Sequence, residues 1–362
     1  MKFIHISDIH LGMTPDPASF WSEDRANDIR KSFANVINKC RDEEIDFLLI
    51  SGDLFNHQPL TDDLTYVNNL FKTIMDTKIV IVAGSADHIK TSSPILNFNF
   101  SENVYYFFDK TEIAFEIDRK TVIVHGFSYF SFEDSTPIIN SITPENDNNI
   151  HILLAYAGDM NHSPFDVNKL KKKNFTYIAL GSNHNYEKII ANKAYYAGAI
   201  EPLNQNDTGD HGIIVGEIDS STRQIVNLKF EKTAIAAYVP ITIKINGSNN
   251  EDDIVEIVIR EVLKLGAQNI YKIKITGYRN PDLEITREIF SKKIRISEII
   301  DNSIPKYDFI RLSAEHPQDM IGAYIRRMYN NHKDQDELSE IEKRALYLGT
   351  HALIKTSENK DF

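Results

Sequence analysis

The chain has 362 residues, of which 42% are apolar and 25% charged, a composition typical of an ordinary globular protein. Its length exceeds that of a usual single hydrophobic core, so we expect one large domain and a smaller one. The formal net charge of −12 argues against independent, tight and nonspecific nucleic-acid binding, because phosphate contacts normally need a basic face.

No apolar stretch approaches the ~18 consecutive residues of a membrane span. The opening residues MKFIHISDIH run straight into a predicted strand without a signal-peptide cleavage pattern. We therefore expect a cytoplasmic protein with no membrane contact. The single cysteine, Cys40, lies at helical spacing from Phe33, Val36 and Ile37, which predicts a small core residue and not a nucleophile.

Short apolar runs followed by polar turns recur through the first two thirds of the chain, and such runs are typical of buried strands covered on both faces. Helical patterns lie between them, most clearly over Asn27–Glu44 and Leu64–Met75. The alternation predicts an α/β sheet with crossover helices, in which ligand chemistry gathers at the carboxyl ends of the strands. The predicted strands are Phe3–Ser7, Phe47–Ser51, Ile79–Ala83, Val122–Gly126, Ile150–Ala155 and Tyr177–Gly181.

The pattern changes after Lys232, where a small β-α-β unit is predicted. Its strand, helix and second strand are Tyr238–Ile245, Glu251–Leu265 and Ile270–Thr276. Two helical segments then follow, over Asp319–Tyr329 and Glu337–Ile354. The first of these is amphipathic, and we interpret its apolar face as core packing in preference to partner docking.

Side chains with metal-ligand chemistry follow the first two predicted strands. Asp8 and His10 form a D-x-H sequence on one tight turn, and Asp53 follows Gly52 at the end of the next strand. A lone glycine–aspartate pair carries little meaning, but its combination with the earlier D-x-H turn is much more specific. Carboxylate and imidazole ligands together suit manganese, iron or zinc better than magnesium or calcium.

The series resembles the calcineurin-like metallophosphoesterases, and within them the SbcD exonuclease group with its YhaO-like branch. The resemblance rests on HISDIHLG, LLISGDLFN and the later stretch YYAGAIEPLNQNDTGDHGIIVGEI. It implies a four-layer α/β/β/α sandwich over residues 1–232. A small α/β capping domain is expected over residues 233–312, and a helical C-terminal segment over residues 313–362.

The resemblance also implies a site of two metals that share one bridging aspartate. The positions implied for the first metal all survive in this sequence. They are Asp8, His10, the bridging Asp53 and His184. We therefore expect about one metal ion per chain, with manganese favoured over iron or zinc.

The other half of the implied site is degenerate. Its three further ligand positions are occupied by Ser85, Tyr156 and Ser182, and Ala86 stands where the resemblance implies a catalytic histidine. Loss of one electrostatic donor to a transition state typically costs ~2.7 to 4 kcal/mol. Because a metal is lost as well, weak or absent nuclease activity is expected.

Two histidines are candidates for a replacement catalytic group. His88 lies two residues past Ala86, although a surface position is the interpretation we favour. His57 follows Phe55 and Asn56, where substrate-side polar residues are frequent in the family, and functional and structural roles are equally favoured. The other motif-free histidines are expected to be packing or surface residues: His125, His151, His162 and His211.

These observations favour a catalytically impaired SbcD-type subunit that acts in DNA processing. The resemblance implies a coiled-coil ABC ATPase of the SbcC type as partner and makes a homodimer plausible, whereas DNA binding by the chain alone should be weak. The first alternative is an active one-metal phosphoesterase or phosphodiesterase with an altered substrate. A two-metal exonuclease is a further alternative, and the number of surviving ligands argues against it.

Overall fold

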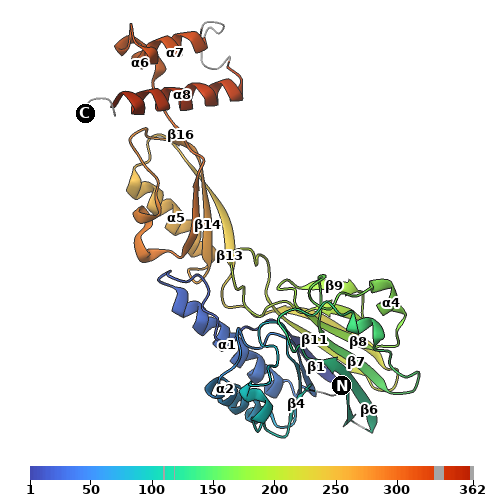
Figure 1. The fold of residues 1–362 in the computed structure, drawn as a ribbon. Coiled ribbons are helices and arrows are strands. Elements are labelled where there is room, and N and C mark those ends of the chain that lie inside the picture. The colour runs from blue at the N-terminus through green and yellow to red at the C-terminus, as the bar shows by residue number, and fades with distance from the viewer. Residues whose placement is uncertain (109–110, 118, 330–337, 359–362) are drawn as a thin grey trace. The chain divides into compact units, whose positions relative to one another are not determined.

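The computed structural model describes residues 1–108, 111–117, 119–329 and 338–358. The chain divides into two compact units, Met1–Tyr238 and Val239–Phe362 (Figure 1). Within the described residues, no helix is both long and apolar enough to cross a membrane. The two units meet after Tyr238, and the predicted domain bounds at residues 232 and 312 stay predictions.

Within its described residues, the first unit holds two sheets of six strands each. In the first sheet the order is β12-β11-β1-β2-β3-β4, with β1 to β4 parallel and β11 and β12 antiparallel. The strands are β1 (Lys2–Ile6), β2 (Phe47–Ser51), β3 (Lys78–Val82), β4 (Val104–Tyr106), β11 (Gly212–Asp219) and β12 (Gln224–Lys232).

The second sheet has the order β5-β6-β7-β8-β10-β9, with parallel pairing from β6 to β10 and antiparallel strands at both edges. Its strands are β5 (Glu112–Ile117), β6 (Lys120–Phe127), β7 (Ile150–Tyr156), β8 (Tyr177–Gly181), β9 (Glu187–Ile190) and β10 (Ala194–Tyr196). The six strands predicted for the first unit correspond to β1, β2, β3, β6, β7 and β8 of the two sheets and are confirmed, with bounds shifted by a few residues at most.

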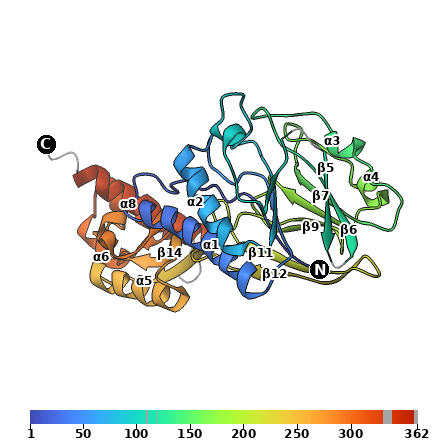
Figure 2. The same cartoon turned by 90° about the horizontal axis from the view of Figure 1, so that it is seen from below.

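Helices cover the outer face of each sheet, and Figure 2 shows the two helical layers on opposite sides of the sheets. The first sheet is covered by α1 (Ser22–Asp42), α2 (Thr61–Phe71) and the 3-10 turns η1 (Lys72–Ile74) and η2 (Pro94–Asn97). The second is covered by α3 (Ile138–Ser141) and α4 (Val167–Lys172). The predicted four-layer α/β/β/α sandwich is confirmed.

The alternation of side chains along each strand divides the core into layers. On β1, Ile4 and Ile6 pack toward α1 and α2, whereas Phe3 faces the second sheet. Strands covered on both faces are apolar throughout, which explains the continuous runs in the sequence. Cys40 is buried in the cluster under α1, and burial raises the pKa of its thiol to about 12, so it is a core residue as predicted.

The second unit begins with the predicted β-α-β arrangement. The bounds of β13 (Tyr238–Ile245) and α5 (Glu251–Leu265) match the prediction, and Asn250 and Asp253 form the capping box that starts α5. The remaining strands of this sheet are β14 (Ile270–Arg279), β15 (Ile296–Asp301) and β16 (Ile304–Pro305), and the 3-10 helix η3 (Arg287–Lys293) lies between β14 and β15 in the chain. Ile254, Val258 and Val262 of α5 pack onto this sheet.

Within its described residues, the second unit continues with the helices α6 (Phe309–Glu315), α7 (Met320–Tyr329) and α8 (Glu340–Glu358). The two predicted C-terminal helices correspond to α7 and α8, although Glu337, the predicted start of the last one, lies outside the described residues. Ile321 and Ile325 of α7 pack with Leu346 of α8, so the apolar face of α7 serves core packing as interpreted.

Candidate metal centre

The strand ends of the first sheet place the first candidate ligands. Asp8 and His10 follow β1, and their backbone N–H groups donate to the carbonyl oxygens of Gly52 (3.1 Å) and Asp53 (3.0 Å). Asp8, His10 and Asp53 have φ angles of 50°, 51° and 49°, in the left-handed region that non-glycine residues occupy at a cost. Three neighbouring residues in this conformation are typical of a functional site that the surrounding fold holds in place.

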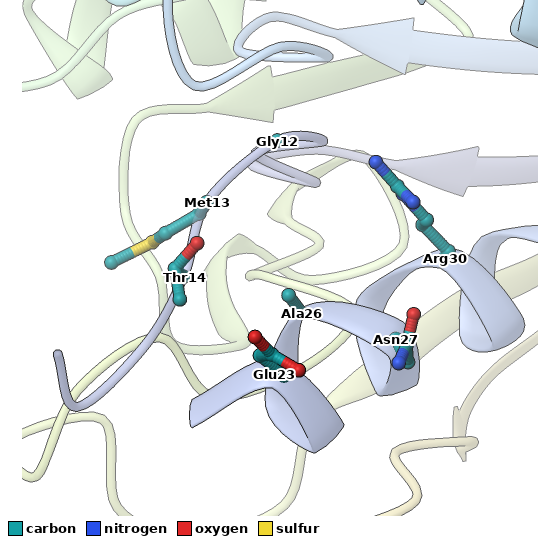
Figure 3. Close-up of a pocket in the computed structure, with 7 residues that line it drawn as sticks. All are labelled: Gly12, Met13, Thr14, Glu23, Ala26, Asn27 and Arg30. Carbon is teal, nitrogen blue, oxygen red and sulfur yellow. The ribbon is translucent and has the colours of Figure 1, made fainter. Parts of the chain in front are cut away.

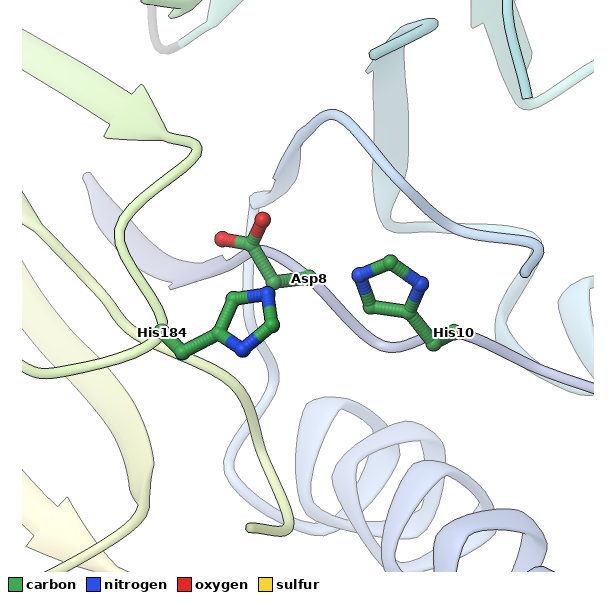
Figure 4. Close-up of side chains that lie close together, drawn as sticks. All are labelled: Asp8, His10 and His184. Carbon is green, nitrogen blue, oxygen red and sulfur yellow. The ribbon is translucent and has the colours of Figure 1, made fainter. Parts of the chain in front are cut away.

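Asp8, His10 and His184 converge although they come from distant parts of the chain (Figure 4). One ligand atom from each lies within 4.8 Å of the other two. The rings of His10 and His184 meet edge to face with centroids 5.4 Å apart. His10 Nε2 is buried and has no hydrogen-bond partner among the described residues. An unsatisfied buried imidazole nitrogen beside a buried carboxylate is the arrangement that a bound cation would complete.

Both histidines are oriented through their Nδ1 atoms. His10 Nδ1 lies 3.2 Å from Asn56 Oδ1, and His184 Nδ1 lies 3.2 Å from Asp207 Oδ2. Asp207 is itself fixed, because its Oδ2 accepts a hydrogen bond of 2.9 Å from the backbone N–H of Leu203. Such contacts set the tautomer and leave Nε2 free as a metal ligand.

The electrostatics of the cluster favour a bound cation. Burial lowers the pKa of His10 to about 4, so this ligand is neutral near pH 7. Burial also acts to lower the pKa of His184, but the hydrogen bond to Asp207 and the charge of Asp8 outweigh it and raise the pKa to about 9. The pKa of the Asp8 carboxyl is raised, mainly by burial. A divalent cation would replace the protons that these groups otherwise hold.

The model of the calcineurin-like phosphoesterase family matches residues 1–198 of this chain, which is more than half of it. The chain belongs to this family. Calcineurin-like phosphoesterases use divalent metal ions, and the carboxylate and imidazole donors gathered at Asp8, His10 and His184 fit such an ion. The resemblance inferred from the sequence is thereby confirmed.

Curated relatives within the calcineurin-like phosphoesterases include DNA-repair proteins. The chain is 23% identical to the DNA double-strand break repair protein Mre11 of Methanosarcina acetivorans, over 91% of this chain and 56% of the relative. It is 25% identical to the uncharacterized metallophosphoesterase YhaO of Bacillus subtilis, over 65% of this chain and 63% of the relative. It is 23% identical to the DNA double-strand break repair protein Mre11 of Methanocaldococcus jannaschii, over 69% of this chain and 72% of the relative. The chain thus spans less than two thirds of the first two relatives.

Asp53 lies beside the three clustered ligands. Its Oδ2 is 3.6 Å from His10 Nε2, and its Oδ1 accepts a hydrogen bond of 2.8 Å from the backbone N–H of Ala86. Its pKa is raised, because burial outweighs that hydrogen bond. The predicted set of four ligands stays a prediction, since Asp53 does not belong to the group whose atoms all lie within 4.8 Å.

The side chains of the predicted degenerate half of the site also lie beside Asp53. Tyr156 Oη lies 2.9 Å from Ser85 Oγ, and Ser85 Oγ donates over 3.5 Å to Asp53 Oδ2. Tyr156 is wedged tightly, because a Cβ atom added at Gly52 would lie 2.3 Å from its ring. The backbone N–H of Ser182 donates to both oxygens of Asp8 at 3.2 Å. The neutral side chains of Ser85 and Tyr156 therefore lie beside Asp53, and Ser85 contacts the same carboxylate oxygen that lies 3.6 Å from His10 Nε2.

The two weaker histidine candidates are held outside the cluster. His88 Nδ1 lies 2.7 Å from the carbonyl oxygen of Ser85, so its ring is engaged with the backbone. His57 is exposed, and its Nδ1 contacts the carbonyl oxygen of Gln58 at 3.0 Å. Neither is among the residues grouped with Asp8. A catalytic role for either one stays a prediction.

Two hollows lie beside the turn that carries His10. The first, of about 250 Å³, is lined by Gly12, Met13, Thr14, Glu23, Ala26, Asn27 and Arg30 (Figure 3). The second, of about 240 Å³, is lined by Leu11, Gly12, Arg30, Phe55, Asp62, Asp63 and Tyr66. Arg30 is shared by both hollows and is accompanied by Glu23 in the first and by two aspartates, Asp62 and Asp63, in the second, so these hollows are poor sites for a phosphate group.

Sequence reasoning missed Asn56 and Asp207, which orient the two histidine ligands. Asn56 lies in LLISGDLFN and Asp207 in the stretch from Tyr195 to Ile218, so both fall within segments that carry the resemblance. The need of a ligating histidine for a partner on its second nitrogen is the signal that could have found them. Only the structure shows which acceptor meets which ring.

Proposed function

We propose that this protein is a one-metal member of the Mre11- and SbcD-like group of repair phosphoesterases, with phosphodiesterase activity well below that of a two-metal enzyme. The observation that carries the proposal is the contrast between two groups of side chains beside Asp53. One group has oriented histidines and a buried unsatisfied nitrogen, whereas the other contains the neutral, hydrogen-bonded pair of Ser85 and Tyr156.

Different residues of this chain would bind the metal ion and orient its ligands. Asp8, His10 and His184, with Asp53, would hold manganese, iron or zinc, and the bound ion would polarise a phosphoryl oxygen. Asn56 and Asp207 contact the Nδ1 atoms of His10 and His184 and so orient the two imidazole rings for metal binding. A second ion would have to displace Tyr156, whose pKa burial raises so far that the phenol stays neutral and is a poor metal ligand.

DNA processing as the cellular role is part of the proposal and is supported by the DNA double-strand break repair relatives. The partner we propose is a coiled-coil ABC ATPase of the SbcC type. DNA binding by the chain alone is expected to be weak because the net charge is −12. Homodimer formation and a cytoplasmic location belong to the same proposal. Size-exclusion chromatography of the chain, alone and with such an ATPase, tests the assembly.

Metal titration combined with hydrolysis of a simple phosphodiester tests the core of the proposal. We expect one tightly bound manganese ion per chain and slow hydrolysis of bis(p-nitrophenyl) phosphate, both lost in Asp8→Ala and in Asp53→Ala. Asp210→Ala is the matched control, because this carboxylate is exposed and pairs with Lys232. Two tightly held ions per chain, or activity that survives Asp8→Ala, would contradict the proposal.

The alternative function is an active one-metal phosphoesterase whose substrate has changed. The exposed aromatic side chains of Phe130 and Phe132 favour it, because large apolar groups open to solvent are frequent at binding sites. Fast hydrolysis of bis(p-nitrophenyl) phosphate with one bound ion would support this alternative. Slow hydrolysis with one bound ion supports the impaired enzyme.

A further inference from the structure

The loop after β7 is closed on itself by backbone hydrogen bonds. The N–H of Gly158 donates to the carbonyl oxygen of His162 (2.6 Å), and the N–H of His162 donates to that of Asp159 (3.1 Å). On its other side the loop pairs with Asp134, whose N–H donates to the carbonyl oxygen of Asn161 (2.9 Å). These bonds fix the backbone on both sides of His162, so the imidazole has a defined position.

This loop borders the degenerate half of the metal centre. A Cβ atom added at Gly158 would lie 3.2 Å from Ser182 Oγ, which shows how closely the loop passes that residue. The His162 ring meets the Tyr156 ring edge to face, with centroids 5.9 Å apart. A protonated His162 would be close enough to favour the ionised form of Asp53. His162 is therefore next to the site, although the sequence offers no motif for it.

His162 and Asp159 form a hydrogen-bonded pair. His162 Nδ1 lies 2.7 Å from Asp159 Oδ1, and the same oxygen accepts a hydrogen bond of 2.9 Å from the N–H of Asn161. In the described part of the chain no hydrogen bond engages Nε2, the second ring nitrogen of His162. An imidazole held by a carboxylate on one nitrogen and open on the other is arranged for proton transfer.

His184 has the same arrangement, with Asp207 on Nδ1, but the proposed function uses its open Nε2 as a metal ligand. Of the two weaker candidates, His88 uses Nδ1 to contact the carbonyl oxygen of Ser85, and His57 lies beside Gly12 with its Nδ1 against the carbonyl oxygen of Gln58. The methyl group of Ala86 cannot transfer a proton at all. Apart from the proposed metal ligand His184, His162 is thus the histidine described near Asp53 that combines a carboxylate partner with an unengaged nitrogen.

We propose that His162, oriented by Asp159, is the proton donor of the phosphodiester cleavage and stands in for the histidine absent at Ala86. This inference rests on the proposed function. An oxygen of the attacking water bonds to phosphorus while the bond from phosphorus to the leaving oxygen breaks. The proton on His162 Nε2 passes to that leaving oxygen, the attacking water gives a proton to solvent, and solvent reprotonates His162. Asp159 is a positioning residue, because it acts through the imidazole.

The surroundings of the pair suit an organic leaving group. Phe132 is 59% exposed and its ring meets the His162 ring with centroids 6.4 Å apart, while Met160 of the same loop is 74% exposed. An apolar rim beside a proton donor offers a surface for the aryl or nucleoside part of a phosphodiester.

Leaving-group dependence separates proton donation from a structural role. The two substrates are methyl p-nitrophenyl phosphate, whose leaving group departs without a proton, and methyl phenyl phosphate, whose leaving group needs one. With manganese bound, we expect His162→Gln to lower kcat for the phenyl ester about 100-fold, because general acids typically contribute ~10² to 10⁴ in rate. The p-nitrophenyl ester should change by less than about 3-fold, since no proton transfer to it is required.

The matched control is the same substitution in the His316–Asp319 pair of the second unit, another imidazole with an aspartate three residues away. His316→Gln should leave both esters unchanged. Asp159→Asn should lower kcat for the phenyl ester without raising KM. An equal loss on both esters in His162→Gln, or no loss on either, would overturn the assignment of His162.

Binding gives a readout that needs no turnover. With zinc in the centre, the imidazole resonances of His162 should shift on titration with dimethyl phosphate, and Asp159→Asn should alter the ring tautomer seen by nitrogen NMR. Unperturbed resonances would contradict the inference. Failure of this inference can be distinguished from failure of the proposed function. If the chain binds one metal ion and its activity depends on Asp8, but His162→Gln has no effect, only this inference is wrong. If the chain binds two metal ions, the proposed function is wrong.

Discussion

The imidazole Nδ1 of His184 lies 3.2 Å from the carboxylate Oδ2 of Asp207, and this contact makes metal affinity depend on pH. The hydrogen bond to Asp207 and the charge of Asp8 raise the pKa of His184 to about 9 against the effect of burial. The metal-free protein therefore holds a proton on His184 below pH 9, and a metal ion must displace it. Manganese affinity should rise with pH by up to about tenfold per unit between pH 7 and 9. Calorimetry in buffers of different ionisation enthalpy should detect the released proton, and a pH-independent affinity would contradict this.

Substitution of the positioning carboxylate tests the same contact. Asp207→Asn should bring the His184 pKa down toward its ordinary value, because the charge that holds the proton is removed. The pH dependence of manganese binding between pH 7 and 9 should flatten, and affinity at pH 9 should fall about 10- to 100-fold as the ring loses its orientation. Asp210→Asn is the matched control. Equal effects of the two substitutions would show that net charge, and not the contact, matters.

Rebuilding the degenerate half of the site tests whether lost ligands explain the expected impairment. The variant combines Ser85→Asn, Ala86→His, Tyr156→His and Ser182→His. We expect it to bind a second manganese ion and to hydrolyse bis(p-nitrophenyl) phosphate faster than the unchanged chain. Single substitutions should do little, because the ligands act as a unit. A fourfold variant that folds, yet binds one ion as before, would show that the loss lies elsewhere.

The buried pair of Arg25 and Glu201 is expected to be a large contributor to stability. Both side chains are fully buried, with Nη1 of Arg25 3.0 Å from Oε2 of Glu201, and Ser32 Oγ donates to the same carboxylate over 2.6 Å. Arg25→Met leaves the carboxylate uncompensated and should cost ~3 to 5 kcal/mol in unfolding free energy.

Urea unfolding measures this cost, and Arg41→Met on the same helix is the control. Arg41 is half-exposed and pairs with Asp42, so its loss should cost less than ~1 kcal/mol. Adding Glu201→Met to Arg25→Met should recover part of the loss, because it removes the unpaired charge. Equal destabilisation by Arg25→Met and Arg41→Met would refute the prediction.

His5 is expected to destabilise the first unit in acid. It lies between the sheets, with Nδ1 2.9 Å from Tyr177 Oη and Nε2 2.8 Å from Ser51 Oγ, and burial lowers its pKa to about 3. The unfolded chain binds a proton near pH 6.5, so the stability is present above that pH and is lost as the pH falls from 6.5 toward 3. The slope from this one group approaches ~1.4 kcal/mol per pH unit.

The check is urea unfolding at pH 7, 6, 5 and 4 of the unchanged chain and of His5→Gln, which does not titrate. The variant should be less stable at pH 7 but should lose stability less steeply with acid. His10 and His125, whose pKa values burial lowers to about 4, are present in both proteins and cancel in the difference. Parallel curves would show that His5 is not the group responsible.

Local pattern was enough for much of the fold and for naming Asp8 and His10 as candidate ligands. Strands buried on both faces leave continuous apolar runs, so β1, β2 and β8 are evident without a structure. Asp8 and His10 fall directly after such a run, and side chains at the carboxyl ends of parallel strands gather at the same edge of the sheet. The capped and amphipathic α5 follows from its sequence for the same local reason.

Tertiary structure alone decided which side chains meet. The sequence predicts a surface or packing role for His162, yet the loop after β7 places it against Tyr156 and beside Asp53. It likewise gives no sign that Asp207 faces His184. These contacts depend on the order of strands in two sheets and on how loops close over their ends, and neither periodicity nor spacing along the chain encodes that order. The sequence alone determined the residues available at the strand ends, and the packing of the sheets decided their partners.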